Sequence, residues 1–256
     1  MIRAAPTGIA AHRISGSILH SLFRLPIKSA FNKLLPAALA AIQSHLRDCQ
    51  YLIIDEKSMI SCKQFGWLDR RCRQIFPEAS DILFGGLNVI LFGDFFQLPP
   101  VGGKPLFSDD ALGSTNVAGL YGRNAYRAFD RTVELNVVIR QQGESLAQKR
   151  FREALDSLRN SEVTREYWQT LSSRVQCQLT IQEVSSFDGA LRIYSKKAAV
   201  GEYNYSKLRD YRSPVFIIRS TNRPELKPPA SSDEAGNLHN VLLLCLGARV
   251  MLTENL

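Results

Sequence analysis

Two short apolar runs in the first hundred residues each lead into acidic side chains. Residues Tyr51–Ile54 (YLII) run directly into Asp55 and Glu56, and residues 88–92 (NVILF) are followed closely by Asp94. Apolar runs of this length without polar alternation predict strands that are buried on both faces, as in a parallel sheet. Ligands of such sheets bind beyond the carboxyl ends of the strands, where these acidic residues would emerge.

Apolar spacing typical of helices fills the stretches between the strands, so the pattern predicts an α/β chain with helices flanking parallel sheets. The predicted helices cover residues 9–25, 34–46, 120–129, 145–158, 164–173 and 197–208, and one more begins at Ser58 or Ser61. In that last helix one face is apolar and the other, expected to face solvent, is basic; the residues concerned are Phe65, Leu68, Cys72 and Ile75, and Arg70, Arg71 and Arg73. Further strands are predicted at residues 2–5, 132–139, 187–194 and 214–218, an exposed loop at 221–237, and a strand or hairpin in the apolar end from residue 240.

Composition narrows the class of protein. The 256 residues suffice for one large or two modest domains, and 45% hydrophobic with 22% charged residues is ordinary for a globular protein. A net charge of +8 favours an anionic partner such as nucleic acid. The five cysteines form no CxxC pair, which indicates free thiols and no zinc site. No apolar run approaches the ~18 residues of a membrane helix, so no membrane partner is expected.

The acidic strand ends have two interpretations. In nucleoside triphosphate hydrolysis, one carboxylate such as Asp55 holds hydrated Mg²⁺, and its neighbour Glu56 orients or deprotonates the attacking water. The alternative is that the acids cap the helix that follows. In the second loop, GDFFQLPPV, Gln97 is held by a stiff Pro-Pro segment, and a glutamine so placed can sense a γ-phosphate. Its alternative is an ordinary surface polar residue.

Three further segments carry candidate chemistry. The predicted strand 132–139 delivers Arg140 into a turn, where it could contact phosphate; the alternative is an ordinary surface arginine. The Pro-Thr-Gly turn places Thr7 at a helix start. The segment Gly102-Gly103-Lys104 is similar to the end of a phosphate-binding GxxxxGK[ST] loop, but Pro105 occupies the Ser/Thr position, so it is not a P-loop.

Taken together, APTGIAA, ILHSLFRLP, LIIDEKSM, GDFFQLPPV and ELNVVIRQ resemble, in order and spacing, the Pif-one family of ATP-dependent DNA helicases. These belong to superfamily one and are related to RecD, and this sequence looks closest to the branch found with Helitron-type elements. The later segments ALRIYSKKAAVGEYNYSKL and GARVMLTENL also have family counterparts, so the resemblance covers nearly the whole chain. It implies RecA-like P-loop NTPase domains: a partial first domain over residues 1–135, and a partial second over residues 136–256 that includes the start of an inserted β-rich segment.

The resemblance also implies roles. Asp55 would coordinate Mg²⁺, Glu56 would activate water, and Gln97 would couple the γ-phosphate of ATP to movement on DNA. Arg140 would be an arginine finger, a group typically worth ~10³ to 10⁵ in rate. Thr7, Gly8 and the helix bearing His20 would contact the backbone of single-stranded DNA.

The family function implied is a monomeric five-prime to three-prime helicase that acts on single strands and duplex junctions in DNA repair, recombination or telomere maintenance. The family's P-loop, however, would lie upstream of residue 1. We therefore expect a fragment that is a poor ATPase by itself. The alternatives are a non-enzymatic remnant that binds single-stranded DNA or a protein partner, and a structural or regulatory role unrelated to nucleic acid. The expected location is the nucleus, with the mitochondrion as the alternative. Residues 1–47 contain no acidic residue and are similar in composition to a transit peptide, but the resemblance assigns this segment to the helicase core.

Overall fold

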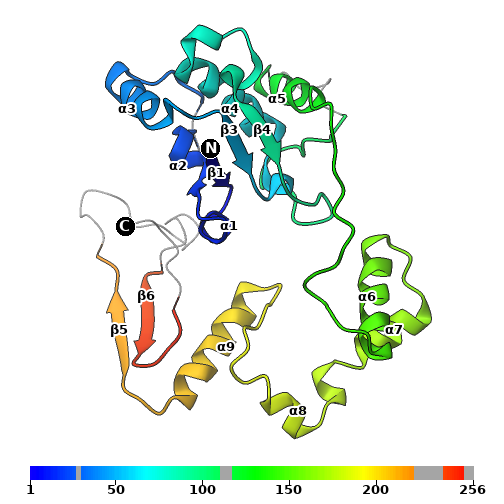
Figure 1. Ribbon diagram of the computed structural model, residues 1–256. Helices are drawn as coiled ribbons and strands as arrows, with labels where there is room; N and C mark the ends of the chain where they lie inside the picture. The colour runs from blue at the N-terminus through cyan, green and yellow to red at the C-terminus, as the bar shows by residue number, and fades with distance from the viewer. Residues whose placement is uncertain (27–29, 110–116, 222–238, 251–256) are drawn as a thin grey trace. The chain divides into compact units, whose positions relative to one another are not determined.

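The computed structural model describes residues 1–26, 30–109, 117–221 and 239–250. The chain divides into two compact units, Met1–Leu171 and Ser172–Leu256, which are described separately below. Figure 1 traces their helices and strands along the chain. The boundary at residue 135 between two RecA-like domains stays a prediction. None of the helices within the described ranges is both long and apolar enough to span a bilayer.

The N-terminal unit contains a parallel sheet in the order β2-β1-β3-β4. Its strands are β1 (Ile2–Ala5), β2 (Ser17–Ile18), β3 (Tyr51–Ile54) and β4 (Asn88–Leu91). Pairing of Ala4 with Ile54 and of Ile54 with Leu91 brings the carboxyl ends of three strands to one edge. The parallel α/β fold predicted from the apolar runs is confirmed.

The described helices of this unit lie between and after its strands along the chain. They are α1 (Gly8–Arg13), α2 (Leu19–Phe23), α3 (Pro36–Leu46), α4 (Cys62–Ile75), α5 (Val117–Arg127), α6 (Leu146–Arg159) and α7 (Arg165–Ser172). Short 3₁₀ turns lie at Lys57–Met59, Pro77–Ala79 and Leu83–Gly86. The helices predicted at 34–46, 120–129, 145–158 and 164–173 are therefore confirmed, with shifted ends.

Helix α4 is the centre of the core. Ser61 caps it, accepting a hydrogen bond from the Gln64 amide while the Gln64 side chain bonds back to the Ser61 amide. The predicted apolar face is buried as expected, at Phe65, Leu68, Cys72 and Ile75. Its N-terminal half lies so close to α5 that a Cβ on Gly66 would be 2.1 Å from the Ala118 carbonyl oxygen.

Arg71 contradicts the prediction of a solvated basic face. Arg71 is only 1% exposed, and its guanidinium donates hydrogen bonds to the carbonyls of Phe23 at 3.1 Å and Asn32 at 3.0 Å. A further bond reaches the Arg24 carbonyl. Burial lowers the pKa of Arg71. The side chain is buried because the loop after α2 turns its carbonyls inward, and a single guanidinium can satisfy several of them.

The prediction that strands β3 and β4 are buried on both faces was too strong. Leu52 and Ile54 of β3 are fully buried, but Tyr51 is 46% exposed, and β4 alternates between exposed and half-buried residues. The strands are parallel, yet the described residues cover only one face well. β4 lies at the edge of the sheet, which explains its exposure.

Other predictions were wrong. The helix predicted over residues 9–25 is interrupted after α1, where Ser15 has a φ of 51° and the chain enters β2. Residues 132–139 form no strand, because no described segment pairs with them, and their apolar side chains are exposed. Residues 187–194 form no strand either; after α8, the amide of Phe187 and that of Ala190 bond locally in turns.

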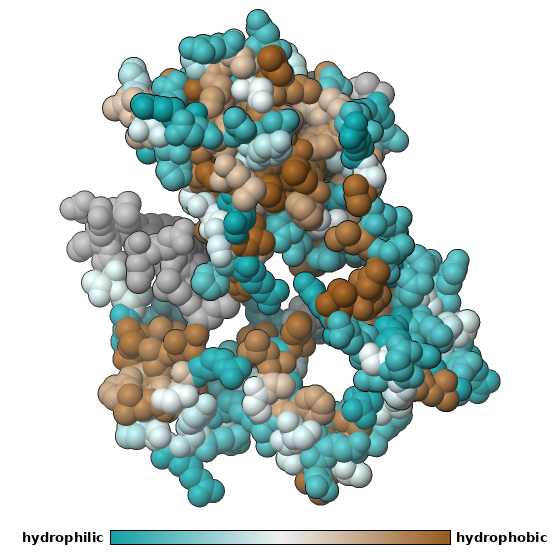
Figure 2. Space-filling view, in the orientation of Figure 1, coloured by the Kyte–Doolittle hydropathy of each residue, from teal (hydrophilic) through white to brown (hydrophobic). Residues whose placement is uncertain are grey.

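The C-terminal unit contains the 3₁₀ turn Gln176–Gln178, α8 (Ile181–Ser185), α9 (Lys197–Asp210) and an antiparallel pair, β5 (Val215–Arg219) with β6 (Val241–Cys245). The helix predicted at 197–208, the strand at 214–218 and a strand near the end are confirmed. Every residue of β5 is exposed, and Figure 2 shows the apolar surface over this hairpin. The predicted loop at 221–237 and the final residues 251–256 lie outside the described residues.

Candidate functional site

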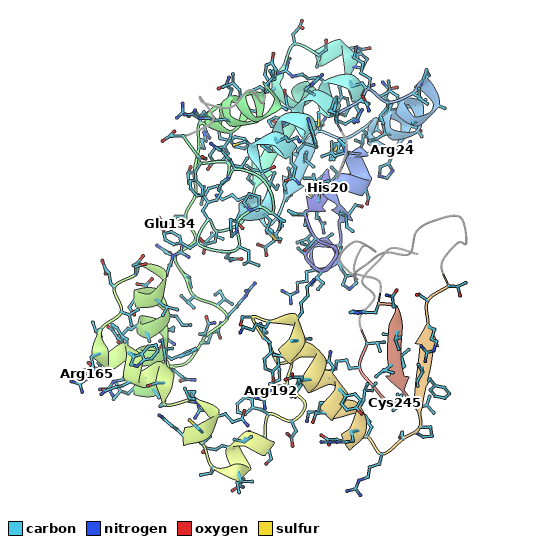
Figure 3. All side chains as sticks on the ribbon, turned by 180° about the vertical axis from the view of Figure 1, so that it is seen from behind. His20, Arg24, Glu134, Arg165, Arg192 and Cys245 are labelled. Carbon is cyan, nitrogen blue, oxygen red and sulfur yellow. The ribbon has the colours of Figure 1, made fainter. Side chains whose placement is uncertain are left out.

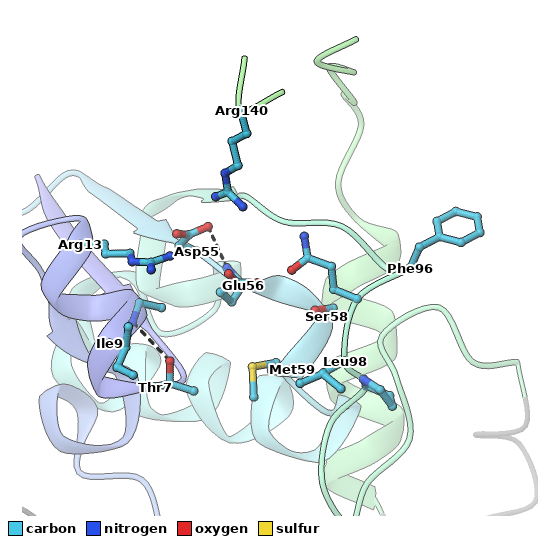
Figure 4. Close-up of a pocket in the computed structure, with 13 residues that line it drawn as sticks. Thr7, Ile9, Arg13, Asp55, Glu56, Ser58, Met59, Phe96, Leu98 and Arg140 are labelled. Atoms are coloured by element: carbon cyan, nitrogen blue, oxygen red, sulfur yellow. Dashed lines mark hydrogen bonds between the residues drawn. The ribbon is translucent and has the colours of Figure 1, made fainter. Parts of the chain in front are cut away.

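An open pocket of about 860 Å³ lies where β1 and β3 end. The loop after β1, the end of β3, the loop after β4 and the extended segment after α5 all contribute to its wall (Figure 4). The predicted site residues on that wall are Thr7, Asp55, Glu56, Gln97 and Arg140. Gly8 and His20 are not among the lining residues. Four segments that are far apart in sequence therefore meet in one pocket.

Hydrogen bonds at the exit of β3 fix the backbone of Asp55 and Glu56. The Asp55 amide donates to the Ala4 carbonyl at 3.0 Å, and one Asp55 carboxylate oxygen accepts from the Glu56 amide at 2.9 Å. Glu56 then takes a left-handed backbone, with φ 55° and ψ 48°, which is uncommon for a residue other than glycine. The next amide, of Lys57, donates to the Phe92 carbonyl at 2.9 Å, which ties this exit to that of β4.

The loop after β4 presents Gln97. The Phe96 amide donates to the Asp94 carboxylate and the Gln97 amide to the Asp94 carbonyl, each at 3.0 Å. Gly93 precedes them with φ 131°, and a Cβ there would lie 2.8 Å from the Lys57 amide nitrogen. Only glycine therefore permits the close approach of the two strand exits.

Two residues on the pocket wall were missed by the sequence reasoning. Ser58 was considered only as a helix cap; instead it is 2% exposed, and its Oγ is buried without a hydrogen-bond partner. A buried hydroxyl of this kind calls for a water or a ligand atom. Arg13, in the last turn of α1, also lines the pocket and is a second cation there besides Arg140. No motif marks either one, because their position depends on the fold of other segments.

Thr7, Gly8 and His20 occupy the α1–α2 region. The Thr7 hydroxyl accepts from the Ala10 amide at 3.3 Å and caps α1, as its place before Gly8 predicts. His20 lies on α2 (Figure 3), with its Nε2 3.2 Å from the Gln64 side-chain nitrogen. That amide nitrogen can only donate, so the His20 ring accepts through Nε2 in the neutral form. Burial lowers the pKa of His20 accordingly.

The segment Gly102-Gly103-Lys104, which the sequence excludes as a P-loop, lies beside the start of α4. The Lys104 carbonyl accepts from the Cys62 amide at 2.9 Å, and Pro105 forms an isolated bridge with Ser61. A Cβ on Gly103 would lie 2.5 Å from the Ser61 Cβ. The segment thus packs against the start of α4 and does not open a helix of its own.

The side chains of the pocket suit Mg²⁺, which needs few protein ligands, better than a metal ion that is held entirely by protein side chains. Across the described residues, no three His, Cys, Asp or Glu side chains gather to hold a metal. Mg²⁺ usually keeps several waters and takes one or two carboxylates together with substrate phosphates. Asp55, one oxygen of which is engaged by an amide, retains lone pairs for this kind of contact.

Comparison with known proteins identifies the family of the chain. The family model of the PIF1-like helicase matches residues 1–167. The chain is 31% identical to the ATP-dependent DNA helicase PIF1 of Danio rerio, across 98% of the chain and 37% of that protein. It is 30% identical to the human ATP-dependent DNA helicase PIF1, across 100% of the chain and 37% of that protein.

Solved structures of Pif1 helicases also match the chain. The crystal structure of the Pif1 helicase from Candida albicans matches with a TM-score of 0.69 and 25% identity, over 98% of this chain and 54% of that one. The Bacteroides Pif1 helicase in complex with ADP-AlF3 and ssDNA matches with a TM-score of 0.59 and 30% identity, over 88% of this chain and 51% of that one. The chain spans 37% of the length of each of the two curated relatives named above. It belongs to the PIF1-like helicase family.

Proposed function

We propose that the pocket is the metal-and-water end of an ATP site, and that the chain is part of an ATP-dependent five-prime to three-prime DNA helicase. The observation that supports this most is the meeting of Asp55, Glu56, Gln97 and Arg140 in one pocket. Two carboxylates, an amide and a guanidinium are the groups that phosphoryl transfer from ATP to water uses. Membership of the PIF1-like family and relatives named ATP-dependent DNA helicases agree with it.

Each residue has a defined task in this proposal. Asp55 holds the Mg²⁺ ion, which supplies charge neutralisation at the phosphates when bound. Glu56, which lines the pocket, accepts the proton of the attacking water. Gln97 contacts the γ-phosphate from the loop after β4, and Arg140 stabilises the charge that develops there. The unpartnered Ser58 hydroxyl fits a position beside an ordered water.

DNA is the proposed second partner. Thr7, Gly8 and His20 are proposed to contact the phosphate backbone of a single strand, and the net charge of +8 supports an anionic partner. We propose a monomer that acts on single strands and duplex junctions in repair, recombination or telomere maintenance. The proposed location is the nucleus, with the mitochondrion as the alternative. Relatives in solved structures are described as bound to ssDNA and at forked dsDNA.

Residues 1–256 by themselves are expected to hydrolyse ATP poorly. No GxxxxGK[ST] segment occurs in this sequence, so the backbone amides and lysine that would hold the β- and γ-phosphates have no counterpart here. DNA-stimulated ATP hydrolysis by the purified chain that Glu56→Gln abolishes would contradict this expectation. The alternative function, single-strand binding without catalysis, is favoured by the basic charge alone.

The site is tested by paramagnetic broadening with Mn²⁺·ATP, in which Mn²⁺ replaces Mg²⁺. We expect the amide NMR signals of Asp55 to Ser58 and of Gln97 to broaden, and Asp55→Asn to weaken the effect at least about tenfold because the metal loses its carboxylate. The matched control is Asp81→Asn, an exposed carboxylate outside the pocket. Broadening that Asp55→Asn leaves unchanged would remove the proposed metal role. Binding of oligothymidylate without any nucleotide-dependent broadening would favour the non-catalytic alternative.

A further inference from the structure

Two arginines of α6 contact two different walls of the pocket region. Arg152 and Arg159 are seven residues apart, which is close to two helical turns and places them on the same side of the helix. Arg159 contacts the loop that carries Gln97, and Arg152 contacts the turn that follows Arg140. Neither arginine belongs to the motifs described above.

Arg159 binds the Gln97 loop in two ways. One guanidinium nitrogen donates to Asp94 Oδ1 at 3.0 Å and the other forms an ion pair with Oδ2, so the contact is bidentate. The guanidinium carbon also lies 4.2 Å from the centre of the Phe96 ring. Asp94 in turn accepts from the amides of Phe96 and Gln97. The Arg159 hydrogen bond lowers the pKa of the Asp94 carboxyl.

Arg152 holds the turn after Arg140. Its Nη1 donates to the Gln141 carbonyl at 3.0 Å and to the Gly143 carbonyl at 2.7 Å. Gly143 has a φ of 123°, a backbone that favours glycine, and Ser145 then caps α6 in a capping box. The backbone beside Arg140, which otherwise forms no regular structure, is thus bonded to α6.

We propose that α6 is a rigid spacer that sets the separation of Gln97 and Arg140, with Arg152 and Arg159 as positioning residues. The role of Gln97 and Arg140 at the γ-phosphate rests on the proposed function. The mechanical link that α6 makes between their two segments does not. A helix of fourteen residues transmits displacement from one end to the other, so the Gln97 loop and the Arg140 turn move together. Two groups that contact one phosphate need such a fixed separation, because small misplacement costs much of the rate.

Amide hydrogen exchange on the full 256-residue chain tests the link. Arg159→Met is expected to raise exchange about threefold to tenfold at residues 94–98, since it removes an ion pair and a cation–π contact. It is also expected to raise exchange at residues 141–143, which it does not touch. Arg152→Met should likewise affect both segments. The control is Arg150→Met on the same helix, whose guanidinium pairs with Glu166 at 3.4 Å away from both loops.

Two further readouts separate positioning from general loosening. Arg159→Lys, which keeps the charge but loses the bidentate contact, should give an intermediate exchange rate. The Asp94 carboxyl, followed by ¹³C NMR, should show a pKa that rises toward its ordinary value in Arg159→Met and not in Arg150→Met. Effects confined to the mutated contact, with the distant segment unchanged, would overturn the spacer. Absence of any Mn²⁺·ATP broadening in the wild-type chain would instead count against the proposed function and leave the exchange result to decide the link.

Discussion

Helices α4 and α9 are both fourteen residues long, but they have opposite relations to solvent. α4 buries an entire apolar face, an aspartate and an arginine, while α9 buries none of its residues. The strands differ in the same way. β3 contributes the fully buried Leu52 and Ile54 to the core, whereas every residue of the equally apolar β5 is exposed.

The difference shows that the local sequence pattern is enough to predict a helix or a strand, but it does not determine whether that helix or strand is buried. A helix forms at Lys197–Asp210, and Val215–Arg219 pairs with Val241–Cys245, although among the described residues of the C-terminal unit only Cys245 is buried. Strand pairing and helix capping occur in both units, but only in the N-terminal unit do the apolar side chains of several elements pack together into an extended core. Substitutions should therefore have large effects in the first unit and small effects in the second.

The largest expected difference concerns phenylalanine. Phe65 is fully buried, with its ring centre 5.1 Å from that of Phe84, and Phe65→Ala should lower the free energy of unfolding of the N-terminal unit by about 3 to 5 kcal/mol. Phe216 in β5 is 56% exposed, so Phe216→Ala should change local stability by less than about 1 kcal/mol. Amide hydrogen exchange in α4 and in β5 measures both. Equal losses would show that the hairpin has a core of its own.

A glycine-to-alanine pair sharpens the comparison. A Cβ on Gly122 of α5 would lie 1.8 Å from the Cys62 carbonyl oxygen, so Gly122→Ala should push α5 from α4 and destabilise the unit by about 1 to 3 kcal/mol. Gly201 in α9 has no atom within 4 Å of that position, and Gly201→Ala should stabilise the helix by about 0.5 to 1 kcal/mol. Urea titration followed by circular dichroism checks the signs. A neutral Gly122→Ala would contradict the close helix contact.

The smallest effect is a pH dependence confined to the N-terminal unit. Burial lowers the pKa of His20 from 6.5, so the unfolded chain binds this proton more readily than the folded one. The contribution is fully present above the unfolded pKa and is lost as pH falls below about 6.5 toward the lower folded pKa. Urea midpoints at about pH 7.5 and about pH 5.5 should therefore differ less in His20→Asn than in the wild type. His45→Asn, at an exposed position in α3, is the control and should keep the wild-type difference.

Much of the first unit was predictable because its signals are local. The Ser61–Gln64 capping box and the Phe65–Ile75 apolar spacing define α4, and the parallel register brings Asp55 and the Gln97 loop to one edge of the sheet. Ser58, Arg13 and the burial of Arg71 were not predictable, since each depends on carbonyls or side chains supplied by distant segments. Residues 132–139 have the composition of a strand. A strand also requires a second strand to pair with, and the composition of a segment does not show whether one is available.

The bonds that hold the strand exits have a consequence for the order of folding. The Asp55 amide bonds to Ala4 and the Lys57 amide to Phe92, so both contacts join segments separated by much of the sheet's sequence. Closing such long loops carries its entropy cost before the contacts that repay it are made, which makes non-local parallel pairing slow. The two carboxylates therefore acquire their geometry only when the sheet closes, and a collapsed intermediate with α4 already formed would still lack the pocket.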